Sequence, residues 1–138
     1  MLALVGLASF AVVACGTDRS ITSAGLDQVA PTRQDIARGA GIRFPTSTRD
    51  FRLTRIGRGQ IDVSFVVATG DVDAFTAGSG VRLTPGRRAI THASPLWDVA
   101  VKGPVSGGSS AYRTVVRNVE AVPDGTTTTI RLSIVPRD

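Results

Sequence analysis

Residues 60–68, with the sequence QIDVSFVVA, decide the fold. Apolar side chains occupy every second position: Ile61, Val63, Phe65 and Val67 alternate with Gln60, Asp62 and Ser64. Because successive side chains of a β-strand point to opposite faces of a sheet, this period predicts a strand with one buried face. Residues 50–56 alternate in the same way, and Gly57-Arg58-Gly59 separates the two stretches, so together they predict a β-hairpin.

Further strands are predicted towards the C-terminus. Residues 126–135 alternate cleanly and residues 112–122 form a longer apolar stretch, with a hairpin turn predicted at Pro123-Asp124-Gly125 between them. Residues 96–102 predict a short strand, whereas the Gly/Ser-rich residues 103–110 predict a surface loop. In the strand at 126–135, the residues expected to face inward are Ile130, Leu132 and Ile134, and those expected to face outward include Arg131 and Ser133. In the strand at 96–102, the residues expected to face inward are Trp97, Val99 and Val101.

Residues 71–78 predict one short helix. Asp71 and Asp73 lie where carboxylates stabilise a helix N-terminus, and Gly78 and Gly80 end it. Because an isolated helix of under about 12 residues is marginal, this one must pack on the sheet. The fold class predicted is α+β, a small antiparallel sheet of about five strands with one short helix packed on it. A small all-β barrel or sandwich is the alternative if the helix is only a turn.

The first fifteen residues, MLALVGLASFAVVAC, are uncharged and strongly apolar, and polar residues follow them at once. The run is too short to span a bilayer, which takes about 20 apolar residues. Its length matches the apolar region of a secretory signal peptide, although it carries no Lys or Arg. Val12, Val13, Ala14 and Cys15 resemble the lipobox of bacterial lipoproteins, and the chain is similar in texture to small actinobacterial lipoproteins.

This resemblance implies an anchor. Residues 1–14 would be removed as a signal peptide, and Cys15 would carry a diacylglyceryl group that holds the protein at the outer face of the cytoplasmic membrane. Residues 15–41, rich in Ser, Thr, Ala and Gly, predict a flexible tether, and residues 42–138 predict a single globular domain. Cys15 is the only cysteine, so the chain has no internal disulfide.

The chain carries a net charge of +5, and arginines are dense between residues 33 and 58. Four of them are candidates for docking on an anionic surface: Arg49, Arg52, Arg55 and Arg58. Arg52 and Arg58 are expected to face solvent, whereas Arg55 has the parity of the inward residues, so the strand is expected to end or bulge there. A positive surface favours a lipid head group, a wall polymer or an acidic protein as partner, and an envelope location disfavours nucleic acid. A solvated, arginine-rich surface without a partner is the alternative.

No catalytic or metal-binding motif stands out. His92 is the only histidine, and no Gly-x-Ser-x-Gly elbow accompanies it, so it is interpreted as a loop residue. A zinc site needs three or four ligands, and Asp71-Val72-Asp73 lacks the spacing of a calcium loop. We therefore predict no cofactor and no metal.

The function predicted is that of a lipid-anchored, non-enzymatic cell-envelope protein that binds a partner or an anionic surface polymer. The alternatives are an inhibitor or immunity-like module and an extracytoplasmic hydrolase of unrecognised type. A deep cleft that joins His92 to Asp71 or Asp98 would favour the enzyme. A shallow basic face would favour the envelope binder, and an exposed apolar patch would favour the inhibitor.

Overall fold

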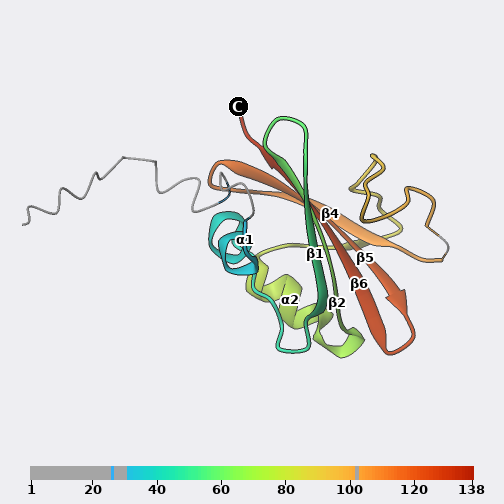
Figure 1. Cartoon of the computed structure of the whole chain (residues 1–138). Helices are drawn as coiled ribbons and strands as arrows, with labels where there is room; N and C mark the ends of the chain where they lie inside the picture. Colours follow the sequence, from blue (N-terminus) through green and yellow to red (C-terminus); the bar gives the residue numbers. More distant parts are fainter. Residues whose placement is uncertain (1–25, 27–30, 102) are drawn as a thin grey trace, which may run out of the picture.

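The computed structural model describes residue 26 and residues 31–101 and 103–138. Its main feature is one open antiparallel sheet of six strands in the order β1-β2-β6-β5-β4-β3. The helices lie on one side of this sheet and residues 86–101 lie on the other (Figure 1). The elements are α1 (Arg33–Ala40), β1 (Arg49–Ile56), β2 (Gln60–Ala68), the 3-10 turn η1 (Thr69–Asp71), α2 (Val72–Ser79), β3 (Thr84–Pro85), β4 (Ser106–Tyr112), β5 (Val115–Asp124) and β6 (Thr127–Pro136).

The core lies between the sheet and the two helices. Strand β2 pairs with β6 over residues 61–68 and 127–134, with Phe65 opposite Ile130. The alternating residues predicted to face inward on these strands are confirmed, because each is at most 1% exposed and belongs to one hydrophobic cluster with the helices. Ile36 of α1 and Phe75 of α2 cover them and are fully buried. Phe65 meets the ring of Phe75 edge-on at 5.7 Å between centroids, an arrangement that adds to the stability gained from burial.

The predicted mainly antiparallel sheet is confirmed, but the count of about five strands and one helix is wrong. The helix at 72–79 is present, but helix α1 and two strands were not predicted. The missed strands are the short β3 and the longer β4, which begins within the predicted loop at 103–110. Glycine has a low strand propensity, so the sequence of β4 does not suggest a strand. A Cβ on Gly108 would lie 1.9 Å from the carbonyl oxygen of Arg82, and one on Gly107 would lie 2.4 Å from that of Arg87. These glycines therefore let other chain segments cross β4 closely.

A second correction concerns residues 31–41, which were assigned to the tether. Residues 33–40 form α1, and the Thr32 and Asp35 side chains and backbone amides satisfy one another in a capping box at its start. Gly41, at φ 63°, ends the helix in the left-handed conformation. Ile36 and Ala40 are fully buried, so this segment belongs to the domain. The predicted signal peptide and Cys15 lie outside the described residues.

A third correction concerns residues 96–101, which were predicted as a strand. They form an irregular segment with a single bridge between Ser94 and Trp97. Of the three residues predicted to face inward, only Trp97 is buried, at 8% exposed, whereas Val99 and Val101 are half-buried. Residues 86–101 together cross the sheet face that the helices leave uncovered, and we call them the covering segment (Figure 1).

Strand β1 does not end or bulge at Arg55. Its irregularity lies earlier, between Arg49 and Arg52, where Asp50 has φ 54°. Arg55 stays paired with Ile61 and points to the helix side, where its guanidinium donates a hydrogen bond to the carbonyl of Leu26. A long side chain with a polar tip thus occupies an inward position by reaching the edge of the core.

The helices in the described part of the chain are short, and none of them is both long and apolar enough to cross a membrane.

Candidate functional site

The sheet face opposite the helices is polar, and we call it the polar face. The strand register places four of its side chains in one row across the sheet: Arg52, Ser64, Arg131 and Glu120. The row beside it is formed by Thr54, Asp62, Ser133 and Asn118. Charged and hydroxyl groups in the middle of a sheet would be ordinary on a solvated face.

The middle of this face is shielded from solvent, because the covering segment lies over it (Figure 1). Asp62, Glu120 and Ser133 are 0% exposed, and Ser64 is 3% exposed. The sequence predicted correctly that Asp62, Ser64 and Ser133 point away from the core, but not that they are buried. Buried polar groups cost free energy unless they are hydrogen-bonded, so each of them must have a partner.

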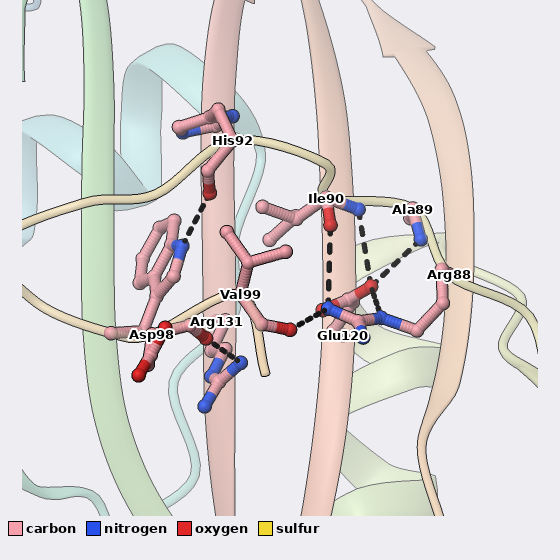
Figure 2. A network of polar contacts seen from close by, with 9 residues as sticks. Arg88, Ala89, Ile90, His92, Asp98, Val99, Glu120 and Arg131 are labelled. Carbon is pink, nitrogen blue, oxygen red and sulfur yellow. Dashed lines mark hydrogen bonds and ion pairs between the residues drawn. The ribbon is translucent and has the colours of Figure 1, made fainter. Parts of the chain in front are cut away.

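Glu120 lies at the centre of one group of contacts (Figure 2). Arg88 donates from Nε to Oε2 at 2.9 Å and from Nη2 to Oε1 at 3.3 Å. The backbone amides of Ala89 and Ile90 donate to Oε2 at 2.8 and 3.1 Å. The same Arg88 Nη2 also donates to the carbonyl of Val99 at 3.1 Å. The buried carboxylate of Glu120 thus holds both arms of the covering segment through charge-assisted hydrogen bonds.

His92 forms the centre of the second group. Its Nε2 lies 2.9 Å from Oδ2 of the buried Asp62. The amide nitrogen of Gln60 donates to Asp62 Oδ1 at 3.4 Å and to Ser133 Oγ at 3.2 Å. The same Gln60 nitrogen lies 3.1 Å from His92 Nε2, so Gln60 and Asp62 contact the same ring nitrogen. Trp97 packs against the His92 ring at 5.8 Å and donates from Nε1 to the His92 carbonyl at 3.2 Å.

The His92–Asp62 pair resembles two members of a catalytic triad but lacks the third. A triad needs a nucleophile hydrogen-bonded to the histidine. Among the described residues no serine, threonine or cysteine forms that bond, and Ser133 is fully buried with Gln60 as its partner. The two carboxylates that would have favoured an enzyme make no hydrogen bond to His92 in the part of the chain described: Asp71 accepts a hydrogen bond from Ser47 at 2.6 Å, and Asp98 is exposed. The pair therefore fastens the covering segment to the sheet.

Two arginines of the polar face bind the covering segment through its backbone. Arg131 donates from Nη1 to the carbonyl of Asp98 at 3.1 Å, and Arg52 donates from Nη2 to the carbonyl of Leu96 at 3.3 Å. Burial lowers the pKa of Arg131 below its ordinary value, and the charge of Glu120 opposes that effect. Arg131 Nε is buried and has no hydrogen-bond partner within the part of the chain that is described.

The four predicted docking arginines do not form one patch. Arg49 and Arg52 are exposed on the side of the polar face, and Arg49 pairs with Asp50 at 2.8 Å. Arg58 is exposed in the turn between β1 and β2, at the end of the sheet. Arg55 is half-buried on the opposite, helix-covered side.

Arg117 is a buried cation that the sequence did not single out. It is 2% exposed and lies on the helix side of β5. Its Nη1 donates to the carbonyls of Ala40, Gly41 and Ser79 at 3.1, 3.2 and 2.6 Å, at the C-terminal ends of α1 and α2. Its Nη2 donates to Ser110 Oγ at 2.9 Å. A positive charge is favourable at helix C-termini, so one guanidinium fixes both helices.

Burial lowers the pKa of Arg117, and Tyr112 opposes that shift. Arg117 lines an open groove of about 640 Å³ between the helix ends, together with Arg43 and Tyr112. A second groove, of about 460 Å³, lies beside α2, and its mixed lining includes the apolar Val81 and Leu83 and the charged Asp73 and Arg82. His92 lines neither of these two grooves.

The described residues contain no group of three or more His, Cys, Asp or Glu side chains that would hold a metal ion. Comparison of the chain with protein-family models, with curated proteins and with solved structures finds no match.

Proposed function

We propose that this chain is a lipid-anchored, non-enzymatic protein of the cell envelope whose domain binds an anionic surface or partner. The observation that carries the proposal is the charge of the surface. Eleven arginines are exposed among the described residues, against five exposed aspartates; two further aspartates are half-buried, and Asp62 and Glu120 are buried under the covering segment. Three of the eleven, Arg38, Arg49 and Arg88, pair with a carboxylate within the described part of the chain, and eight do not. The exposed arginines are Arg33, Arg38, Arg43, Arg49, Arg52, Arg58, Arg82, Arg87, Arg88, Arg113 and Arg137. A surface of this sign attracts anions over about a Debye length.

The geometry around His92 supports a non-enzymatic role. Its partner Asp62 is fully buried, and Asp62 and Gln60 both contact the same ring nitrogen, Nε2. No serine, threonine or cysteine among the described residues is hydrogen-bonded to the ring. The His92–Asp62 pair, which is the arrangement most similar to a catalytic site, fastens the covering segment to the sheet, and this is a structural role.

The anchor is supported by the lipobox-like residues Val12, Val13, Ala14 and Cys15. Two acyl chains on one cysteine hold a protein firmly to a membrane, whereas a single chain binds only marginally. The position of the protein at the outer face of the cytoplasmic membrane follows from that chemistry.

The test is fractionation of cells that express wild type or Cys15→Ser. Wild type is expected in the membrane fraction and released by detergent but not by high salt. Cys15→Ser should remain uncleaved or become soluble, because no thiol is left to carry the lipid. Wild type recovered from the culture medium, or a Cys15→Ser variant that fractionates like wild type, would refute the lipid anchor.

The anionic part of the proposal has a separate test. Binding of the detergent-purified protein to polyglutamate is expected to weaken steeply as salt is added, because ions screen charge attraction. Neutral dextran of the same length is the control. Equal binding to both polymers, or binding insensitive to salt, would contradict a role for the exposed arginines.

A further inference from the structure

We propose that one end of the sheet faces the membrane and docks on anionic phospholipid head groups. This end carries Arg58, Arg113 and Arg137, and we call it the arginine end. The proposal rests on the lipid anchor proposed above and adds to it the orientation of the domain and the chemistry of the surface that the domain contacts.

Three separate chain segments meet at the arginine end. They are the β1–β2 turn, the β4–β5 turn and the residues after β6, since Val115 pairs with Pro136 and Gly59 lies beside Pro136. The backbone amide of Arg137 donates to the carbonyl of Thr114 at 2.7 Å, and Arg137 Nη1 donates to that of Arg113 at 3.2 Å. Figure 1 shows the β1–β2 turn and the C-terminus together at the top of the sheet. The three arginines therefore share one fixed platform.

The charges of this platform are available to a partner. Arg58, Arg113 and Arg137 are all exposed, and none of them has a carboxylate within 4 Å among the described residues. Asp138 follows directly and lowers the net side-chain charge of these four residues to +2. The guanidinium of Arg113 lies 5.4 Å from the centre of the Tyr112 ring, which positions it by a cation–π contact.

Arg113 has φ 51°, a left-handed backbone conformation that favours glycine or asparagine in a hairpin turn. An arginine at this position carries backbone strain that a glycine would avoid. The strain is consistent with a side chain kept for its charge.

The opposite end of the sheet has the opposite sign. The β5–β6 turn carries Asp124, and Thr69 at the start of η1 binds this turn through the carbonyls of Gly125 and Thr126. Asp71 and Asp73 follow within the next four residues. Arg82 is near them, since it lines the same groove as Asp73. An anionic membrane would attract the arginine end and repel this one, so the domain's charge asymmetry selects one orientation.

The path of the chain agrees with that orientation. Leu26 is the first described residue, and its carbonyl accepts a hydrogen bond from Arg55. Arg55 is the last residue but one of β1, so Leu26 lies near the arginine end of the sheet. The eleven residues from Cys15 to Leu26 span at most about 36–40 Å when fully extended. If the far end of the sheet faced the membrane instead, these residues would have to run the length of the sheet, which is about 33 Å for the ten residues of β6. That distance is nearly the whole extended length of the segment.

The experiment places a fluorescent probe at either end of the lipidated full chain. Ala111→Cys lies at the arginine end of β4 and Thr126→Cys lies in the far turn; both positions are exposed. Each labelled protein is reconstituted in phosphatidylcholine vesicles with or without phosphatidylglycerol, and head-group spin-labelled lipids quench the probe. Each arginine near an anionic surface should favour docking about fivefold at low salt. We therefore expect strong quenching at Ala111→Cys and weak quenching at Thr126→Cys, only with phosphatidylglycerol, fading as salt rises.

A variant with Arg58, Arg113 and Arg137 changed to Gln should lose the difference between the probes. A matched variant with Arg33, Arg82 and Arg87 changed to Gln removes the same charge from other exposed positions and should keep the difference. Equal quenching of the two probes on phosphatidylglycerol vesicles, or a difference that survives the first variant, overturns the inference.

Failure of the anchor is distinguishable from failure of the docking surface. A free thiol at Cys15 would take up a second probe, and that result refutes the lipid anchor by itself. In that case co-sedimentation of the unlipidated chain with the two vesicle types, for wild type and both triple variants, decides the docking surface. A singly labelled, lipidated chain without orientation bias refutes only the docking surface.

Discussion

Replacing Arg117 by Met should destabilise the domain more than any other single arginine substitution. Its guanidinium supplies hydrogen bonds to carbonyls at the C-terminal ends of both α1 and α2. Methionine matches much of the aliphatic stem of arginine, so the substitution removes mainly the charge and the donors. The variant thus isolates what the cation does for the two helices.

The magnitude follows from the acceptors left behind. The bonds to the carbonyls of Ala40 and Ser79 are buried, at 3.1 and 2.6 Å. A buried acceptor without a partner costs about 1–3 kcal/mol, so the two together cost about 2–6 kcal/mol. The negative ends of two helix dipoles add to this cost, whereas removing a buried charge gives some of it back. The free energy of unfolding of a domain of this size is about 5–15 kcal/mol in total, so this loss is a large share of it.

The assay is urea unfolding, followed by far-ultraviolet circular dichroism for the helices and sheet. Trp97 fluorescence reports separately on the polar face, because Trp97 packs on the opposite side of the sheet. Arg117→Lys retains a point charge without the forked donors and should fall between wild type and Arg117→Met. The control is the exposed Arg82→Met, which should stay within about 0.5 kcal/mol of wild type. If Arg117→Met also stays within that margin, the two-helix role of Arg117 is refuted.

Three further predictions concern other parts of the fold. Phe65→Ala should cost about 3–5 kcal/mol in urea unfolding, because the ring is fully buried; a cost under 1 kcal/mol would contradict its place in the core. Glu120→Gln should cost about 1.5–3 kcal/mol and shift Trp97 emission to the red as the covering segment loosens; an unchanged native spectrum would argue against that fastening. The backbone amide of Thr32 holds the pKa of Asp35 below its ordinary 3.8. The ionised Asp35 carboxylate should therefore stabilise the fold fully above pH 3.8, and this stabilisation should be lost as the pH falls through the lower pKa of the folded state. Asp35→Asn should therefore flatten the acid side of the stability profile, and a profile identical to wild type would count against the capping box.

The alternation in β2 and β6 was sufficient to predict the core. Leu132 lies between the polar Arg131 and Ser133, and Phe65 continues the alternate apolar positions of Ile61 and Val63. The strand period therefore decides their face without knowledge of the rest of the fold. Strand β4 could not be predicted in this way. Gly107 and Gly108 carry no side chain, and the strand forms because other segments must approach its backbone closely, which is a tertiary constraint.

The direction of the polar-face side chains could be predicted from the sequence, but their burial could not. The strand period showed correctly that Asp62 and Ser133 point away from the core, but no local pattern indicates that a distant loop covers them. The pairing of His92 with Asp62 joins residues thirty positions apart, so it depends on how the covering segment crosses the sheet. One signal was present and missed: Arg117 has the inward parity of Val119, which is unusual for a charged residue.

The most direct test of the account is the intact mass of the protein extracted with detergent from its own membranes. The lipid anchor predicts a chain that begins at Cys15, lacks residues 1–14 and carries the added mass of a diacylglyceryl group on that cysteine. The same preparation should not react with a thiol reagent, because Cys15 is the only cysteine and its sulfur would carry the lipid. A membrane-extracted chain that retains Met1, or one whose Cys15 is a free thiol, would contradict the central claim.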